Sequence, residues 1–169
     1  MTKQTTQVNG VAGSHDVLTL VEALDVEGRL LGELKTILQQ QRQGVATDDL
    51  GVIDDSVFAA HRVMGTLKEA QKRRRTLVEI LTGTETTPLD ELDEALGTEM
   101  TPGLLAVRDR LHHEARELAR EIRINHRVLQ GAMEQGSRMI QVLRCASAGM
   151  PTPGLAVAEP TASFIDQRV

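Results

Sequence analysis

The residues best suited to metal chemistry are His112, His113 and Glu114, with Glu117 and Glu121 shortly downstream. On a helix, His113 and Glu117 would lie one turn apart and could bind one ion together. Adjacent helical residues point about 100° apart, however, so His112 and His113 cannot both face that ion. A helical di-iron site would also need Glu-x-x-His repeats on two helices, and the chain has no such set. We therefore interpret the cluster as solvated helix-face residues and expect no metal and no cofactor.

A basic run, Lys72-Arg73-Arg74-Arg75, is the next candidate, for nucleic-acid binding or a localisation signal. The run falls in the middle of a predicted helix, so its side chains spread around the whole circumference. Arg74 falls on the apolar face, along which its aliphatic stem can lie. We therefore favour a structural or ion-pairing role for this run.

No pattern of residues indicates catalysis. Cys145 has neither a Cys-x-x-Cys mate nor a histidine near it in the sequence, which favours an unreactive thiol at a helix end. The chain lacks a glycine-rich phosphate loop, a His-Glu-x-x-His motif and a nucleophile elbow. We assign no catalytic residue and expect a protein that is not an enzyme.

Composition narrows both the fold class and the partners. The 169 residues include two aromatic side chains, Phe58 and Phe164, and carry a net charge of -5. This shortage of aromatic residues favours helices over sheets and leaves no stacking platform for single-stranded nucleic acid. The mildly acidic charge provides no basic field for DNA or anionic lipid. We expect an all-α protein that binds no nucleic acid.

The cellular compartment is indicated by three further observations. Cys145 is the single cysteine, so no intramolecular disulfide can form, which fits a reducing environment. No apolar stretch approaches the roughly 20 residues that span a bilayer. Residues 1–7 lack the apolar core of a signal peptide. We expect a cytoplasmic protein without a membrane span.

Apolar periodicity predicts three helices, near 16–42, 48–82 and 102–146, packed as an antiparallel coiled-coil-like bundle. Ser14 or Asp16 could cap the first helix, and Thr101-Pro102 is a typical start for the third. We expect a flexible arm at 1–14, the helical bundle at 15–146 and a flexible tail at 147–169, because glycines and prolines after Cys145 cannot continue a helix.

Each predicted helix presents one seam of mainly apolar residues. The first seam is Val17, Leu20, Leu24, Glu27, Leu31, Leu34 and Leu38. The second is Leu50, Ile53, Val57, Ala60, Met64, Leu67, Gln71, Arg74, Val78 and Leu81. The third is Leu104, Arg108, Leu111, Ala115, Leu118, Ile122, Asn125, Leu129, Ala132, Gly136, Met139 and Leu143.

The third helix is predicted to be longer than its neighbours. At ~1.5 Å per residue the three helices span roughly 40, 50 and 65 Å. If the third helix is aligned residue for residue with the antiparallel second helix, the second helix extends no further than Gly136. Met139, Ile140 and Leu143 should then project past the turn that joins the first two helices. At the other end, where the first helix is too short, a segment with leucines at 89, 92 and 96 could fill the gap.

Asn125 is the lone asparagine on the third seam. A polar residue in such a seam typically fixes helix register or partner choice at some cost in stability. The alternative is that Asn125 merely lies at the bundle edge.

Residues 125–133, Asn-His-Arg-Val-Leu-Gln-Gly-Ala-Met, resemble the third helix of the FlgN family of flagellar type III export chaperones. That helix tends to carry an asparagine followed by leucine-rich positions that lead into a long C-terminal arm. Residues 72–81, Lys-Arg-Arg-Arg-Thr-Leu-Val-Glu-Ile-Leu, are similar to the Arg-x-x-Leu-Leu end of the family's second helix. The resemblance covers roughly residues 16 to 146.

The resemblance implies a cytoplasmic chaperone that holds the C-terminal helical segments of hook-associated proteins and passes them to the export apparatus. An exposed helical arm would receive the amphipathic client segment, with methionines that adapt to more than one partner. Family tails often carry an aromatic residue near a glycine, and residues 150–154 have none, which favours binding by the arm. The predicted partner-binding residues are Asn125, Leu129, Met133, Met139, Ile140 and Leu143.

Two other functions are alternatives. A self-assembling coiled-coil scaffold would use the same apolar arm to close a homodimer. The second alternative is an adaptor subunit of another secretion or division complex. The sequence leaves all three alternatives open.

Overall fold

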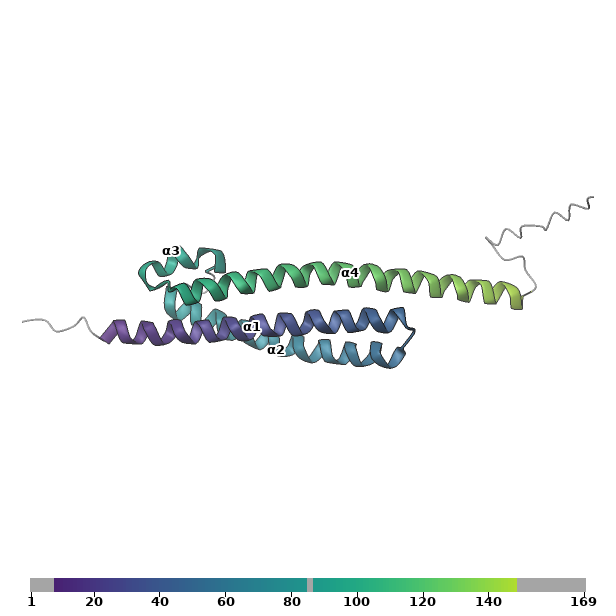
Figure 1. Ribbon diagram of the computed structural model, residues 1–169, viewed down its shortest axis with the longest axis horizontal. Helices are drawn as coiled ribbons and strands as arrows, with labels where there is room; N and C mark the ends of the chain where they lie inside the picture. The colour runs from purple at the N-terminus through teal and green to yellow at the C-terminus, as the bar shows by residue number, and fades with distance from the viewer. Residues whose placement is uncertain (1–7, 85–86, 149–169) are drawn as a thin grey trace, which may run out of the picture. The chain divides into compact units, whose positions relative to one another are not determined.

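The computed structural model describes residues 8–84 and 87–148, and this part of the chain is helical and contains no strand. Figure 1 shows how the long helices α1, α2 and α4 and the short helix α3 are arranged. Their order is α1 (Val8–Ala46), α2 (Leu50–Thr82), η1 (Leu89–Glu91), α3 (Leu92–Leu96), η2 (Gly97–Glu99) and α4 (Pro102–Ser147). The predicted all-α fold is confirmed. The contacts divide the chain into two units, Met1–Leu129 and Gln130–Val169.

The bounds of α2 and α4 follow the predicted signals closely. Asp49 caps α2 by accepting a hydrogen bond from the backbone N–H of Val52 at 3.1 Å. Gly83 ends α2 with φ of 70°, a left-handed conformation that glycine adopts without steric cost. The Thr101 hydroxyl accepts from the backbone N–H of Leu104 at 3.2 Å, so the predicted cap of α4 is formed.

The first helix begins earlier than predicted. α1 starts at Val8, whereas the capping signals pointed to Ser14 or Asp16. Once a helix is established, each added residue gains one hydrogen bond, so it can extend through Gly10 and Gly13 without a cap. The prediction that the first helix is too short at this end is therefore wrong. The other predictions for residues 1–7 and 149–169 fall outside the described part of the chain.

The core lies in the first unit and centres on α1. The core residues of α1 face α2 on one side and α4 on the other. Leu92 and Leu96 of α3 are also buried in this core. The buried cluster contains Val17, Leu20, Leu24, Leu31, Leu34, Ile37, Val63, Leu67, Val78, Leu92, Leu96, Leu104, Leu111 and Leu118. The leucines at 92 and 96 thus pack on the bundle, as the sequence predicts.

Ion pairs fix the register between α1 and α4. The Lys35 ammonium of α1 donates a hydrogen bond to the Glu114 carboxylate of α4, with 2.8 Å between nitrogen and oxygen. The Arg42 guanidinium of α1 lies 2.6 Å from the Glu121 carboxylate of α4. The hydrogen bond to Glu114 raises the pKa of Lys35, and the hydrogen bond from Arg42 lowers the pKa of Glu121. Both shifts keep the pairs ionised near neutral pH. Because the residue numbers rise together, α1 and α4 run parallel, with α2 antiparallel to α1 (Figure 1).

Part of the predicted α2 seam is not buried. Leu50, Val57 and Met64 are 74%, 50% and 49% exposed, although the seam prediction placed them in the core. Ser56, Val63 and Leu67, on the adjacent strip of the helix, are buried. α2 is therefore rotated about its axis so that its buried strip faces α1. The row of Leu50, Val57 and Met64 lies to one side of that contact and remains exposed.

Candidate partner-binding site

The long helix α4 carries one row of residues spaced seven apart. Leu104, Leu111, Leu118 and Asn125 are its buried members, and all of them lie in the first unit. This spacing is the heptad repeat that keeps one strip of a helix against its partner. The same spacing continues through Ala132 and Met139.

Asn125 is buried within the first unit, with 5% of its surface exposed. Its side-chain amide nitrogen donates to the Gln41 side-chain oxygen on α1 at 2.5 Å. A buried amide that must find this partner favours one register of α4 against α1. The structure thus separates Asn125 from the other predicted binding residues and gives it a contact with another helix of the same chain.

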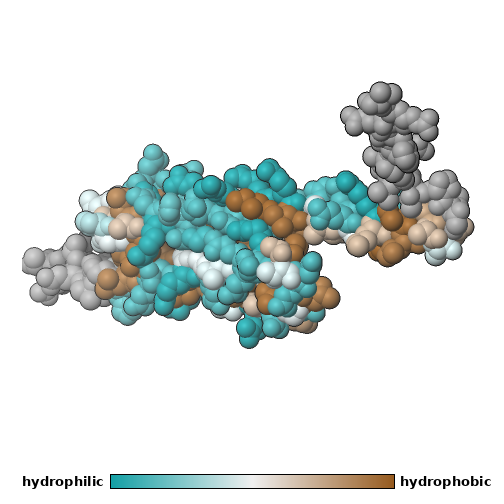
Figure 2. Space-filling view, turned by 45° about the vertical axis from the view of Figure 1, so that its right-hand side comes forward, coloured by the Kyte–Doolittle hydropathy of each residue, from teal (hydrophilic) through white to brown (hydrophobic). Residues whose placement is uncertain are grey.

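In the second unit, the C-terminal part of α4 exposes large apolar side chains. Met133, Met139, Ile140 and Leu143 are 73%, 68%, 60% and 62% exposed. At about 100° per residue, these four lie within an arc of about 120° on one side of the helix. Figure 2 shows apolar surface over much of this part of α4. We call Met133, Met139, Ile140 and Leu143 the arm face.

Except for Val142, the other large side chains of this segment are polar, so the segment is amphipathic. Its other sides carry Gln130, Glu134, Gln135, Ser137, Arg138, Gln141 and Arg144. Leu129, the remaining predicted binding residue, is half-buried and closes the first unit. The structure therefore brings four of the six predicted residues onto one exposed face and leaves Leu129 and Asn125 in the first unit.

The arm face can bind an apolar helix but offers no groups for catalysis. Each large aliphatic side chain buried against a partner contributes ~1.5–3 kcal/mol. The two methionines have flexible, unbranched side chains that fit differently shaped partners.

The described residues contain no group of three or more histidine, cysteine or acidic side chains placed to hold a metal ion. None of the helices in the described part of the chain combines the length and apolarity needed to cross a bilayer.

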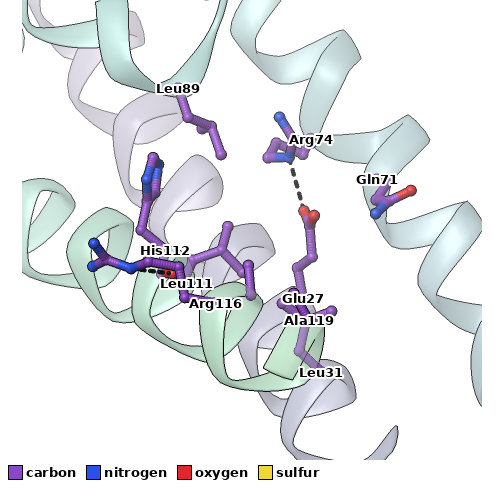
Figure 3. A pocket seen from close by; sticks show the side chains of 10 residues that line it. Glu27, Leu31, Gln71, Arg74, Leu89, Leu111, His112, Arg116 and Ala119 are labelled. Carbon is purple, nitrogen blue, oxygen red and sulfur yellow. Dashed lines mark hydrogen bonds and ion pairs between the residues drawn. The ribbon is translucent and has the colours of Figure 1, made fainter. Parts of the chain in front are cut away.

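Sequence reasoning missed a pocket in the first unit, although the ion-pairing role predicted for the basic run is confirmed there at Arg74. The Arg74 guanidinium donates to the Glu27 carboxylate at 2.8 Å, with the Glu27 side chain 5% exposed (Figure 3). Glu27 and Arg74 are charged residues on predicted apolar seams. Their placement on seams that face each other was the signal from which the ion pair could have been predicted. The cavity beside them measures about 550 Å³ and is lined by Glu27, Leu31, Gln71, Arg74, Leu89, Leu111, His112, Ala115, Arg116 and Ala119.

Comparison with known proteins gives one result that covers most of the chain. The FlgN protein family matches residues 17–152, which include the buried core, Asn125 and the arm face. No curated protein and no solved structure matches the chain.

Proposed function

The chain belongs to the FlgN family of flagellar export chaperones, and on this premise we propose that it binds hook-associated proteins in the cytoplasm before type III export. The client segment in this proposal is a C-terminal amphipathic helix. It lies with its apolar side on the arm face. The chaperone then passes the client to the export apparatus without catalysing a reaction.

The observation that carries this proposal is the exposure of Met139, Ile140 and Leu143 on one side of a continuous helix. Three large side chains in one strip form an extended apolar surface, which in a folded protein typically marks a binding site. A partner helix with apolar residues at three- and four-residue spacing can cover this strip along its whole length.

A homodimer is the alternative that one observation favours. The heptad row that buries Leu111, Leu118 and Asn125 continues through Ala132 and Met139, and a second copy could pack on it as a coiled coil. The chaperone and the homodimer use the same face, so each should exclude the other.

Light scattering distinguishes the chaperone from the homodimeric scaffold. It is measured on the full-length chain, with and without a peptide of a hook-associated protein's C-terminal helix. We expect one peptide bound per chain, and any homodimer present should dissociate as the peptide occupies the arm face. A homodimer that persists unchanged at saturating peptide would favour the scaffold and contradict the chaperone proposal.

A further inference from the structure

The first unit contains a groove between α2 and α4. Its floor includes Leu31 of α1, and its walls include Gln71 of α2 and Ala115 and Ala119 of α4. Leu89 of η1 lines one end of this cavity of about 550 Å³ (Figure 3). The two alanines are one turn apart on α4, and their small side chains leave the wall open to close approach.

Half-exposed apolar side chains extend the groove beyond the cavity. Met64 and Val57 precede Gln71 at seven-residue intervals on α2, so they follow the same strip of that helix. Ile122 follows Ala115 by seven residues on α4. Val57, Met64 and Ile122 are each about half exposed, and together with the cavity they provide a strip of apolar surface on both walls.

The rims of the groove are basic. Arg116 lines the cavity on α4, and Arg123 lies on the same side seven residues later. On α2, Lys68 and Arg75 flank the cavity-lining Gln71 at spacings of three and four residues. Lys68, Arg75, Arg116 and Arg123 form no ion pair with any residue the structure describes.

Three acidic residues of the same helices, Glu69, Glu114 and Glu121, face away from the groove. On α4, Glu114 and Glu121 pair with Lys35 and Arg42 of α1, on the flank away from the groove. On α2, Glu69 is the one acidic residue between positions 56 and 78, and it lines a separate pocket with Ala23 and Val26. Asp109 precedes Arg116 by seven residues and pairs with Arg108, and Glu79 follows Arg75 by four residues. The basic part of the rims is therefore the stretch from Lys68 to Arg75 on α2 and from Arg116 to Arg123 on α4.

We propose that this groove is a second docking site, which binds an amphipathic α-helix of a protein partner whose polar flanks are acidic. The helix would lay its apolar side on Leu31, Met64 and Ile122, as the fourth helix of a bundle. Its carboxylates would then face the basic residues of both rims. The apolar floor favours a protein helix over nucleic acid, whose phosphates need charge without an apolar strip.

The test uses the full-length chain and a designed probe of about 18 residues, a length of about 27 Å as a helix. The probe carries leucines on one face and glutamates on both flanks. We expect it to bind at low salt and more weakly at high salt. A probe with lysine in place of every glutamate should bind at least about tenfold more weakly. Equal binding of the two probes would overturn the proposal, as would displacement of the glutamate probe by a single-stranded DNA oligonucleotide.

Two charge-reversal variants locate the site. Arg116→Glu with Arg123→Glu should weaken the glutamate probe at least about tenfold, because both exposed side chains lie on the groove rim. The matched control, Arg138→Glu with Arg144→Glu, makes the same charge change on α4 outside the first unit and should bind the probe as the unmodified chain does. Equal loss in both variants would show charge attraction without a site and overturn the proposal.

A third variant separates the groove from the arm face. Ile140→Asp with Leu143→Asp should leave binding of the glutamate probe unchanged, since neither residue lies in the groove. If this variant loses the probe, the probe binds at the arm face and the proposal of a second site is wrong.

Discussion

Replacing Ile140 and Leu143 together with aspartate is expected to weaken binding of the client helix by at least about a hundredfold. Each aliphatic side chain that the client buries contributes ~1.5–3 kcal/mol, so the pair contributes ~3 kcal/mol or more. A carboxylate buried against an apolar helix without a partner adds to the loss. The stability of the free chain should change by less than about 0.5 kcal/mol, because both side chains are exposed.

Two controls make this result specific to the arm face. Gln130→Asp with Gln141→Asp adds the same charge to the same segment on its polar side, and client binding should remain close to that of the unmodified chain. Leu118→Ala, in the buried core, should instead lower the free energy of unfolding by ~2–5 kcal/mol. Melting and peptide binding are measured on the same samples. If the Ile140 and Leu143 pair unfolds the chain, the arm face is core and the proposed binding site is wrong.

Replacing Arg74 with methionine is expected to lower the free energy of unfolding by about 3 kcal/mol. The change leaves the Glu27 carboxylate buried without its cation, and an unpaired buried charge is strongly unfavourable. Arg74 borders the 550 Å³ cavity, so solvent can reach the site, and we therefore place the cost at the low end of the range for buried pairs. Urea denaturation measures the loss as a lower midpoint at an unchanged slope.

The double variant Glu27→Leu with Arg74→Met tests the cause of that loss. Removing both charges leaves two apolar side chains at seam positions, so most of the lost stability should return. If the double variant is as unstable as Arg74→Met alone, the loss comes from the packing of the Arg74 stem and not from the unpaired carboxylate.

The sequence predicted the helices well where the signals are local. Thr101-Pro102 and Gly83 act through their own backbone conformation and capping bonds, so the start of α4 and the end of α2 could be located without tertiary information. The start of α1 had no such signal. Helix extension through Gly10 and Gly13 depends on the stability of the helix that follows, which capping rules do not measure.

The groove could not be predicted because periodicity does not specify how helices rotate and separate. Met64 and Leu67 are adjacent members of one predicted seam, yet Leu67 is buried and Met64 is half exposed. Heptad spacing places both residues on one broad side of α2. The position of α1 relative to α2 decides which of the two side chains is covered. The Glu27–Arg74 pair depends on the same three-dimensional placement, since 46 residues separate the two partners in the sequence.

The overhang of Met139, Ile140 and Leu143 was predicted from comparing helix lengths, and the exposure of these side chains supports that prediction. Met133, which the resemblance added, is exposed as well. Asn125 was placed in the same set because it starts the segment that resembles the FlgN family. The structure supports the register role that its seam position indicates, because Asn125 is buried and its hydrogen bond to Gln41 joins α4 to α1. Sequence similarity alone could not distinguish a residue that binds a partner from one that positions the helix.

Hydrogen exchange on the full-length chain, with and without a hook-associated protein's C-terminal helical peptide, tests the client-binding site most directly. The backbone amides of residues 130–147 should exchange faster than those of the first-unit core in the free chain, because few buried contacts support this segment. Bound peptide should slow exchange in residues 130–147 and leave exchange in α1 unchanged. Peptide binding that slows exchange only within residues 8–129, with no change in 130–147, would contradict the proposed binding site.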